Sequence, residues 1–370
     1  MQVKLALNNM TDAPSQFASK GLEISRQFNV RVANKSQYRR CYDYVVSSNK
    51  ASIYHLPEWC ELIKQIFGHA SYYLVAESLQ GEIIGILPIV RLKSRLFGDY
   101  MVSMPYFNYG GAVAINEKIE KALIDNAINI AKELDSQHIE FRDTGRRDEY
   151  PSVRTDKVAM ILSLPDNQDI LWKKLGAKRR SQINRPLREG VEVKCGTTEL
   201  LADFYRVFAH NMRDLGTPVY SKKFFSEILK RFSDYAQIIC VYHKDEPVSA
   251  AFLIGFKGQL EIPWASTLRS VNAIGVNMLL YWEVLKYAIG RGYKTFDFGR
   301  STIDSGTYRF KKQWGAQPKQ LYWHYWMNEG RKMPELTPSN PKYQLAIKAW
   351  QHLPLFVTNR IGPLIVKNLP

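Results

Sequence analysis

The chain is poor in metal-binding side chains for its 370 residues. Cys41, Cys60, Cys195 and Cys240 are far apart, form no CxxC pair and have no histidine beside them at ligand spacing. These spacings argue against a structural zinc site. The seven histidines are also scattered, so we expect them to be surface or satisfied core residues. The sequence therefore predicts no metal site.

Long hydrophobic runs are missing as well. The longest uninterrupted apolar run, residues 83–90, is far shorter than a membrane-spanning helix. The apolar residues 3–7 are too few for the core of a secretory signal, and no small-residue cleavage site follows them. We therefore expect a cytoplasmic protein.

Acidic residues are scarce in the second half. Residues 1–165 carry 20 basic and 18 acidic side chains, whereas residues 166–370 carry 31 and 17, so +14 of the net charge of +16 lies there. This excess predicts a polyanionic partner, and nucleic acid, coenzyme phosphates, a nucleotide-sugar pyrophosphate and an anionic membrane surface all fit it. Composition is otherwise typical of a globular protein, with 45% hydrophobic and 23% charged residues. The length suggests two domains.

The two halves show the same order of expected elements at an offset of about 160 residues, which indicates an internal repeat. In the first half we expect a strand at 30–32, a helix at 57–67, hairpin strands at 72–76 and 83–90, a helix at 117–134, and strands at 138–142 and 158–164. Their counterparts are a strand at 191–193, a helix at 221–232, hairpin strands at 236–242 and 248–255, a helix at 274–289, and strands at 295–298 and 321–327. Each final strand is expected to complete the sheet of its own half.

This order resembles the fold of the GNAT N-acetyltransferase superfamily, present twice, although any α/β protein can be cut into similar halves. The expected class is α/β (α+β), with two tandem GNAT-like domains joined by a basic helix. The predicted divisions are an N-terminal extension at 1–25, a first domain at 26–165, a connecting helix at 166–190, a second domain at 191–330 and a basic, apolar tail at 331–370.

The connecting segment carries seven basic residues and one acid between residues 171 and 190. Asp169 is expected to cap its helix, Gly190 to end it, and Pro186 to kink or break it near Gln182. A solvated linker and a phosphate-binding helix both remain open. The phosphate-binding alternative assigns substrate contacts to Lys178, Arg179 and Arg180.

Residues 295–318 carry the densest chemistry of the chain. Phe296 and Phe298 alternate as in a half-buried strand, Gly299 permits a turn, and a hydroxyl-rich loop leads to Lys311 and Trp314. Polar groups after a strand commonly face a ligand. The segment therefore predicts the floor of an active site.

Four segments together resemble the FemAB family of aminoacyltransferases. The basic helix leading into residues 189–191 is similar to the one before the second FemAB domain, and residues 292–299 resemble the family's "G…YDFGG" strand. Residues 310–315 resemble its "FKxxFG" segment, with Trp314 for the second Phe, and residues 213–216 resemble its "RxxG" turn. Residues 211–218, 340–343 and 359–364 are most similar to FemAB-like proteins associated with exosortase and PEP-CTERM systems.

The resemblance implies attack of an amine on an activated acyl group, which in FemAB enzymes is an aminoacyl ester of tRNA. The acceptor is a peptidoglycan precursor in those enzymes, whereas the exosortase-associated subgroup is linked to exopolysaccharide production. The expected partners are therefore a small-molecule or lipid-linked envelope precursor and a tRNA donor, with no bound cofactor. An acyl-CoA donor stays open, although the usual acetyl-CoA signature is degraded at residues 272–277. Arg300 replaces the second glycine of the family strand.

Acyl transfer needs a neutral amine, a stabilised oxyanion and a proton for the leaving group. By its match to the family lysine, Lys311 is expected to stabilise the oxyanion or to supply that proton. Asp297 and Asp304 are candidates for orienting the lysine or the amine, and Tyr308 for passing a proton. A structural role for Asp297, as a hydrogen-bond partner of the backbone at the strand end, fits the sequence equally well.

Substrate binding is assigned to a second set of residues. Arg213 suits an acceptor diphosphate because its planar fork binds oxyanions bidentately. Arg300 is expected to influence which donor is accepted, and Asn108 and Tyr109 to form an acceptor wall or, alternatively, to be packing residues.

The tail after Glu335 has no acid and mixes basic with apolar residues. It can lie on an anionic membrane, which would place the protein at the inner face, or pack over the second domain. For the whole chain, two alternatives to an aminoacyltransferase remain: an acyl-CoA-dependent N-acyltransferase, and a non-catalytic module that binds polyanions for the envelope machinery.

Overall fold

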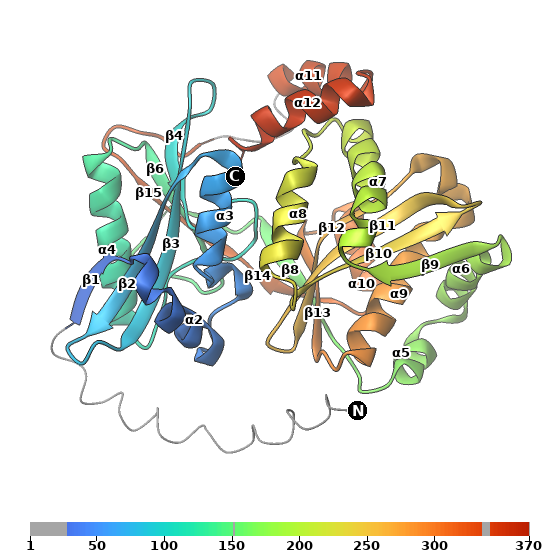
Figure 1. The fold of residues 1–370 in the computed structure, drawn as a ribbon, viewed down its shortest axis with the longest axis horizontal. Coiled ribbons are helices and arrows are strands. Elements are labelled where there is room, and N and C mark those ends of the chain that lie inside the picture. The colour runs from blue at the N-terminus through green and yellow to red at the C-terminus, as the bar shows by residue number, and fades with distance from the viewer. Residues whose placement is uncertain (1–27, 151, 335–340, 370) are drawn as a thin grey trace.

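The computed structural model describes residues 28–150, 152–334 and 341–369. The predicted extension at 1–25 and residues 335–340 of the predicted tail lie outside these ranges. Two sheets with their covering helices lie side by side (Figure 1).

The first sheet has eight strands and is built mainly from the first half of the chain. Its order is β1 (Phe28–Val32), β2 (Ala70–Ser78), β3 (Ile83–Ser94), β4 (Gly98–Val102), β6 (His138–Asp143), β15 (Tyr322–Met327) and β7 (Val153–Arg154), and β5 (Val113–Ala114) pairs with β3. The helical segments of this half are η1 (Lys35–Gln37), α2 (Tyr38–Ser47), η2 (Ile53–His55), α3 (Glu58–Phe67) and α4 (Glu117–Glu133).

The second sheet has seven strands. Its order is β14 (Gln317–Gln320), β8 (Lys157–Ser163), β13 (Thr295–Thr302), β12 (Gln259–Thr267), β11 (Glu246–Phe256), β10 (Ala236–His243) and β9 (Val191–Gly196). Its helical segments are α5 (Gln168–Lys174), α6 (Ala177–Arg188), η3 (Thr198–Leu200), α7 (Leu201–Asp214), α8 (Lys222–Arg231), η4 (Arg269–Ile274), α9 (Val276–Gly290) and α10 (Gly306–Gln313). The pair α11 (Pro341–Gln351) and α12 (Leu355–Val366) follows.

The final strands of the two halves are exchanged, which corrects the expectation that each completes its own sheet. β8 leaves the first half and pairs with β13, so that Leu162 lies opposite Phe296. β15 returns and pairs with β6, so that Tyr325 lies opposite Glu140. Each sheet therefore contains a strand from the other half of the chain, held there by backbone hydrogen bonds. The predicted domain boundaries therefore describe the order along the chain rather than the composition of each sheet.

Helices α3 and α8 pack against each other across the two halves. Trp59 of α3 stacks on Phe232 with ring centroids 4.2 Å apart, and Phe67 lies 5.1 Å from Phe224. One cluster of buried side chains runs continuously through both halves at this point. Apolar burial of this kind is the main favourable contribution to folding, so the two domains share a core.

Each sheet contains one short parallel pair that separates after a few residues. β12 and β13 are paired only from Gln259 opposite Thr295 to Glu261 opposite Asp297, and β4 and β6 only at Met101–Ile139 and Val102–Glu140. Beyond Asp297 the register of β13 is irregular, and Gly299 there has a φ of 75°, a conformation that favours glycine. Glu261 and Asp297 therefore lie at the point where β12 and β13 separate, which we call the fork.

The connecting segment forms two helices rather than one kinked helix. The break lies between α5 and α6, and Asn167, not Asp169, caps the first of them by accepting a hydrogen bond from the Asp169 N–H. Pro186 lies inside the last turn of α6, so the expected break near Gln182 was wrong. A proline there removes only one late hydrogen bond, because the helix ends two residues later.

Candidate active site

Three buried ionisable side chains meet where β12 and β13 separate. Glu261 is 5% exposed, Asp297 is fully buried and Lys311 of α10 is 8% exposed. Strand pairing places the two carboxylates on adjacent strands in register. Buried charges are costly unless they are paired and hydrogen-bonded, so such a group indicates either a function or a structural ion cluster.

Lys311 is held by the backbone just beyond the fork. Its ammonium donates to the carbonyl oxygens of Gly299 at 3.0 Å and Arg300 at 2.9 Å. The lysine is positioned because α10 begins after Ser305, whose hydroxyl accepts from the Tyr308 N–H at 3.2 Å. An ammonium has three N–H donors, so one remains after these two bonds.

The first domain supplies hydroxyl and amide donors to the carboxylates of the second. Tyr109 donates to Asp297 Oδ2 at 2.5 Å, Tyr54 donates to Glu261 Oε2 at 2.6 Å, and the Asn108 amide reaches Glu261 Oε1 at 3.4 Å. The other oxygen of Asp297 accepts from the Gly299 N–H at 2.7 Å. The cluster is therefore complete only when both domains are in place.

Burial and charge move the pKa values of the three groups toward one another. Burial first, and then the neighbouring Asp297, raise the pKa of Glu261. Burial also raises the pKa of Asp297, against the hydrogen bond from Tyr109. Burial lowers the pKa of Lys311 to about 8, with Asp297 and Glu261 opposing this change and Arg300 adding to it. Glu261, with its pKa raised to about 8, and Lys311 can therefore exchange protons near neutral pH.

Arg300 is an exposed cation next to the cluster, and its charge acts on Lys311. Solvent reaches the Arg300 side chain, which is exposed. The pKa of Arg300 is nevertheless lowered, first by the protein atoms that surround its guanidinium and then by the charge of Arg142. Its guanidinium is 5.0 Å from the ring centroid of Trp323, and that of the buried Arg142 is 4.5 Å from the same ring. Arg142 is neutralised by Glu140 at 2.8 Å. Arg300 has no acidic partner among the described residues, so it can bind an anionic group.

Three predicted site residues do not join the cluster. Tyr308 is buried in the core of the second domain, and Asp304 is exposed in the turn before α10 with a φ of 61°. Arg213 donates through Nε and Nη2 to Asp214 at 3.1 and 2.8 Å, at the end of α7. Their catalytic or binding roles stay predictions with no support from this geometry.

The basic connector lies near the start of α9. α6 packs against α9, and a Cβ at Gly275, which precedes α9, would lie 3.6 Å from the Gln182 carbonyl oxygen. Lys178 and Arg179, one turn earlier, have no ion pair among the described residues, whereas Arg180 donates to the Leu175 carbonyl at 3.0 Å. A helix start beside unpaired cations is suited to phosphate.

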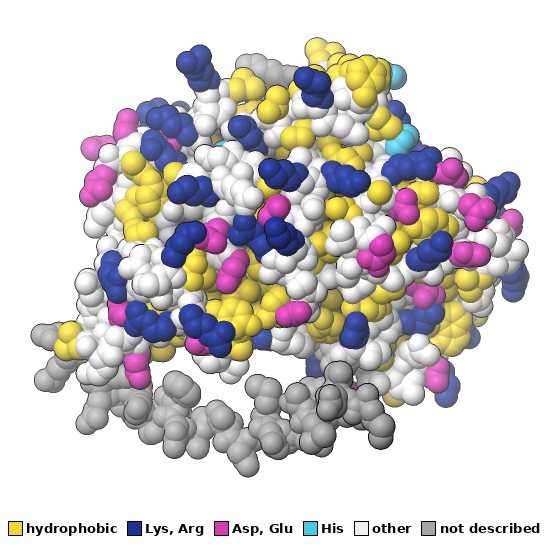
Figure 2. All heavy atoms as spheres, viewed as in Figure 1, with side chains coloured by type: hydrophobic (Ala, Val, Ile, Leu, Met, Phe, Trp, Pro, Cys, Tyr) yellow, Lys and Arg dark blue, Asp and Glu magenta, His cyan; other side chains and the backbone are white. Residues whose placement is uncertain are grey.

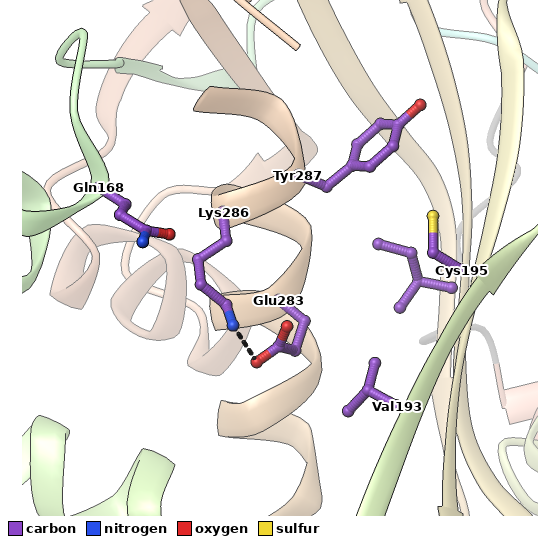
Figure 3. Close-up of a pocket in the computed structure, with 7 residues that line it drawn as sticks. Gln168, Val193, Cys195, Glu283, Lys286 and Tyr287 are labelled. Carbon is purple, nitrogen blue, oxygen red and sulfur yellow. Dashed lines mark ion pairs between the residues drawn. The ribbon is translucent and has the colours of Figure 1, made fainter. Parts of the chain in front are cut away.

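A separate cavity of about 330 Å³ lies between α9 and the strands at the edge of the second sheet (Figure 3). Its lining includes Cys195, Glu283 and Lys286, the last two paired at 2.7 Å. None of the buried cluster lines it. Within the described ranges no group of metal-binding side chains is present, and no helix there is both long and apolar enough to span a bilayer.

Two residues of the cluster were missed from the sequence. Glu261 stands between Leu260 and Ile262 in the segment 260–265, which is otherwise apolar, and a lone carboxylate in such a segment is a usable signal. Tyr54 carries no comparable signal, because it lies in a short 3-10 turn whose partner, Glu261, is distant in sequence.

Comparison with known proteins identifies the fold. The sequence model of the Acetyltransferase (GNAT) domain matches residues 177–312, and no curated protein matches the chain. The crystal structure of FemX is similar with a TM-score of 0.63 and 16% identity, covering 86% of this chain and 100% of that one.

Two further structures are similar over comparable lengths. L-PGS from Bacillus licheniformis has a TM-score of 0.56 and 13% identity, covering 88% of this chain and 99% of that one. A tandem GNAT protein from the clavulanic acid biosynthesis pathway has a TM-score of 0.52 and 11% identity, covering 83% and 100%. The two tandem GNAT-like domains predicted from the order of elements are therefore confirmed.

Proposed function

We propose that this chain is a FemAB-like N-acyltransferase that transfers an activated acyl or aminoacyl group to an amine on a cell-envelope or exopolysaccharide precursor. One observation carries the proposal: where the parallel strands β12 and β13 separate, a buried lysine interacts electrostatically with two buried carboxylates, and among the described residues only two of its three N–H groups are hydrogen-bonded. The likeness to FemX and L-PGS supports it at the level of fold. The exosortase association remains a prediction from sequence.

Glu261 is the proposed general base for the attack of the amine. The amine attacks the carbonyl carbon of the donor ester or thioester, a C–N bond forms, and the carbonyl electron pair moves to oxygen. Ionised Glu261 takes the proton that the nitrogen loses, a task for which a raised pKa is suited. The remaining N–H of the Lys311 ammonium stabilises the oxyanion.

The tetrahedral intermediate then collapses to the amide. The bond from carbon to the ester oxygen or thioester sulfur breaks, and the leaving atom takes the proton that Glu261 gained. Asp297 keeps Lys311 charged, and Tyr109 holds Asp297 from the other domain. A single removed oxyanion donor typically costs about 10² to 10³ in turnover, so Lys311 should have an effect of that size.

The donor is proposed to be an aminoacyl-tRNA, with acyl-CoA as the alternative. Lys178 and Arg179, which form no ion pair within the described ranges, lie beside the start of α9 and are suited to the phosphates of either one. The excess of basic over acidic residues from 166 onward favours the larger polyanion. The degraded acetyl-CoA signature at 272–277 points the same way.

The test follows the donor with and without an amine acceptor. Purified protein is incubated separately with charged total tRNA and with a mixed acyl-CoA pool, and donor loss is measured with an envelope-precursor extract present or absent. We expect acceptor-dependent loss of one donor, abolished in Lys311→Met. Lys312→Met is the matched control, because Lys312 is the exposed neighbour in the same helix. Acceptor-dependent loss that survives Lys311→Met would contradict the assignment.

A second candidate is a non-catalytic polyanion-binding module. It is favoured by the hydrogen bonds that Tyr54 and Tyr109 make across the domains. An ion cluster of this kind can join the two halves without taking part in any reaction. In that case Lys311→Met changes stability alone, and no donor is consumed by the folded wild type.

A further inference from the structure

The helical pair α11–α12 leaves large apolar side chains in water. Leu345 is 76% exposed, Phe356 75%, Leu364 62% and Ile361 40%. Single exposed apolar residues are ordinary, but a group of them on adjoining helices marks an interaction surface. We call these four residues, together with Lys348 and Arg360, the tail face.

The inner side of the pair is already used for packing. Thr358 is 1% exposed, Val366 is 5% exposed, and a Cβ at Gly362 would lie 2.8 Å from the Val219 backbone nitrogen. These three buried residues recur every fourth position along α12, and α12 packs against α7 of the second domain. Phe356, Arg360 and Leu364 recur with the same spacing on the other side, and all three are exposed among the described residues.

The end of the tail is fixed to the first domain. The Lys367 carbonyl accepts from His69 Nε2 at 2.7 Å and from the Tyr106 hydroxyl at 2.6 Å, and the Asn368 carbonyl accepts from Tyr100 at 2.9 Å. The helical pair therefore packs on the second domain, one of the two alternatives left open by the sequence, and is also tied to the first. Its outer side is a fixed feature of the folded molecule.

Charge identifies the kind of partner. Residues 336–370 contain no Asp or Glu, and Lys348 and Arg360 are both exposed among the apolar residues. Figure 2 shows hydrophobic and basic side chains over the α11–α12 end of the molecule, with acidic ones lying elsewhere on this view. Long basic side chains beside apolar ones suit a bilayer, because the apolar groups enter it and the cations reach the headgroups.

We propose that the tail face binds the surface of an anionic lipid bilayer. Leu345, Phe356, Ile361 and Leu364 enter the interfacial region, while Lys348 and Arg360 contact lipid phosphates. Because both domains hold the helical pair, binding would fix the orientation of the whole molecule on the membrane. This inference does not depend on the proposed chemistry.

Flotation with vesicles of stated composition tests it. The full chain is mixed with phosphatidylcholine vesicles that either contain or lack phosphatidylglycerol. We expect flotation only with the anionic vesicles, and at least about a tenfold loss of binding in Lys348→Glu/Arg360→Glu. Phe356→Ser/Leu364→Ser should lose binding similarly. All four positions are exposed, so circular dichroism and thermal melting should match the wild type.

Matched controls use exposed residues outside the tail face. Leu96→Ser, at an 80% exposed position in the turn between β3 and β4, and Arg39→Glu, on α2, should leave flotation unchanged. Failure of the wild type to float with anionic vesicles would overturn the proposal. A dimer in light scattering that Phe356→Ser/Leu364→Ser dissociates, with no flotation, would instead make this face an interface between copies. If variants that no longer float still consume the donor, the loss of membrane binding is independent of the proposed chemistry.

Discussion

The pKa of Lys311 can be measured directly, and its predicted value is unusual. It lies at about 8, against an ordinary value of 10.5, and this difference corresponds to about 3.4 kcal/mol at about 1.36 kcal/mol per pKa unit. At pH 7.5 about a quarter of the Lys311 side chains should be neutral, compared with about one in a thousand for an ordinary lysine.

Competitive acetylation with peptide mass spectrometry measures this value. The protein is treated with trace acetic anhydride over a range of pH, and the labelling of Lys311 is divided by that of free N-acetyl-lysine in the same mixture. We expect Lys311 to reach half its limiting reactivity near pH 8. Accessibility changes the limiting rate but not the midpoint, so low exposure does not hide the result.

Two substitutions should move the midpoint in opposite directions. Asp297→Asn removes the carboxylate that favours the ammonium and should lower the Lys311 pKa further, whereas Arg300→Gln removes a nearby cation and should raise it. A wild-type midpoint near 10.5, or movement of both variants in the same direction, would refute the reasoning about the cluster.

Three further predictions concern turnover and stability. The wild-type rate should pass through a maximum near pH 8, because it rises as Glu261, whose pKa is raised to about 8, becomes ionised and falls as Lys311, whose pKa is lowered to about 8, loses the proton it needs as an oxyanion donor. A pH–rate profile without the descending limb would count against the role of Lys311. Glu261→Gln should lower turnover by about 10² to 10⁴ without lowering stability. Since the folded pKa of Glu261 is raised, wild-type stability should fall as pH rises from the unfolded value through the folded one. Urea unfolding of the variant should show a smaller fall, because only Asp297, whose pKa is also raised, remains. Tyr109→Phe should lower the free energy of urea unfolding by about 1.5 to 3 kcal/mol, as expected for a buried hydrogen bond to a charged group. Tyr42→Phe is the control, because it removes only a hydrogen bond between two hydroxyl groups. An equal loss in the two variants would show that Asp297 is not ionised.

Local elements could be predicted well from the sequence because apolar spacing determines them. The helices at 57–67 and 221–232 are observed as α3 and α8 within one residue at each end. Both have buried apolar residues at helical spacing. The strand at 295–298 was found as the start of β13, although the strand continues to Thr302.

The pairing of the last strands could not be predicted in the same way. β8 and β15 are both largely apolar, so either pattern satisfies either sheet. The choice depends on the path of the chain between the domains, which local patterning does not record. The active-site partners show the same limit: Lys311 and Asp297 belong to one recognisable segment, but Tyr109 reaches Asp297, and Tyr54 reaches Glu261, across the domain boundary.

Isotope transfer from donor to amine tests the central claim most directly. A radiolabelled aminoacyl-tRNA pool is incubated with the envelope-precursor extract and the wild type, Lys311→Met or Lys312→Met, and label in an alkali-stable amide is counted. The account predicts amide formation by the wild type and Lys312→Met, and a loss of at least about a hundredfold in Lys311→Met. Equal amide formation by all three proteins would contradict it.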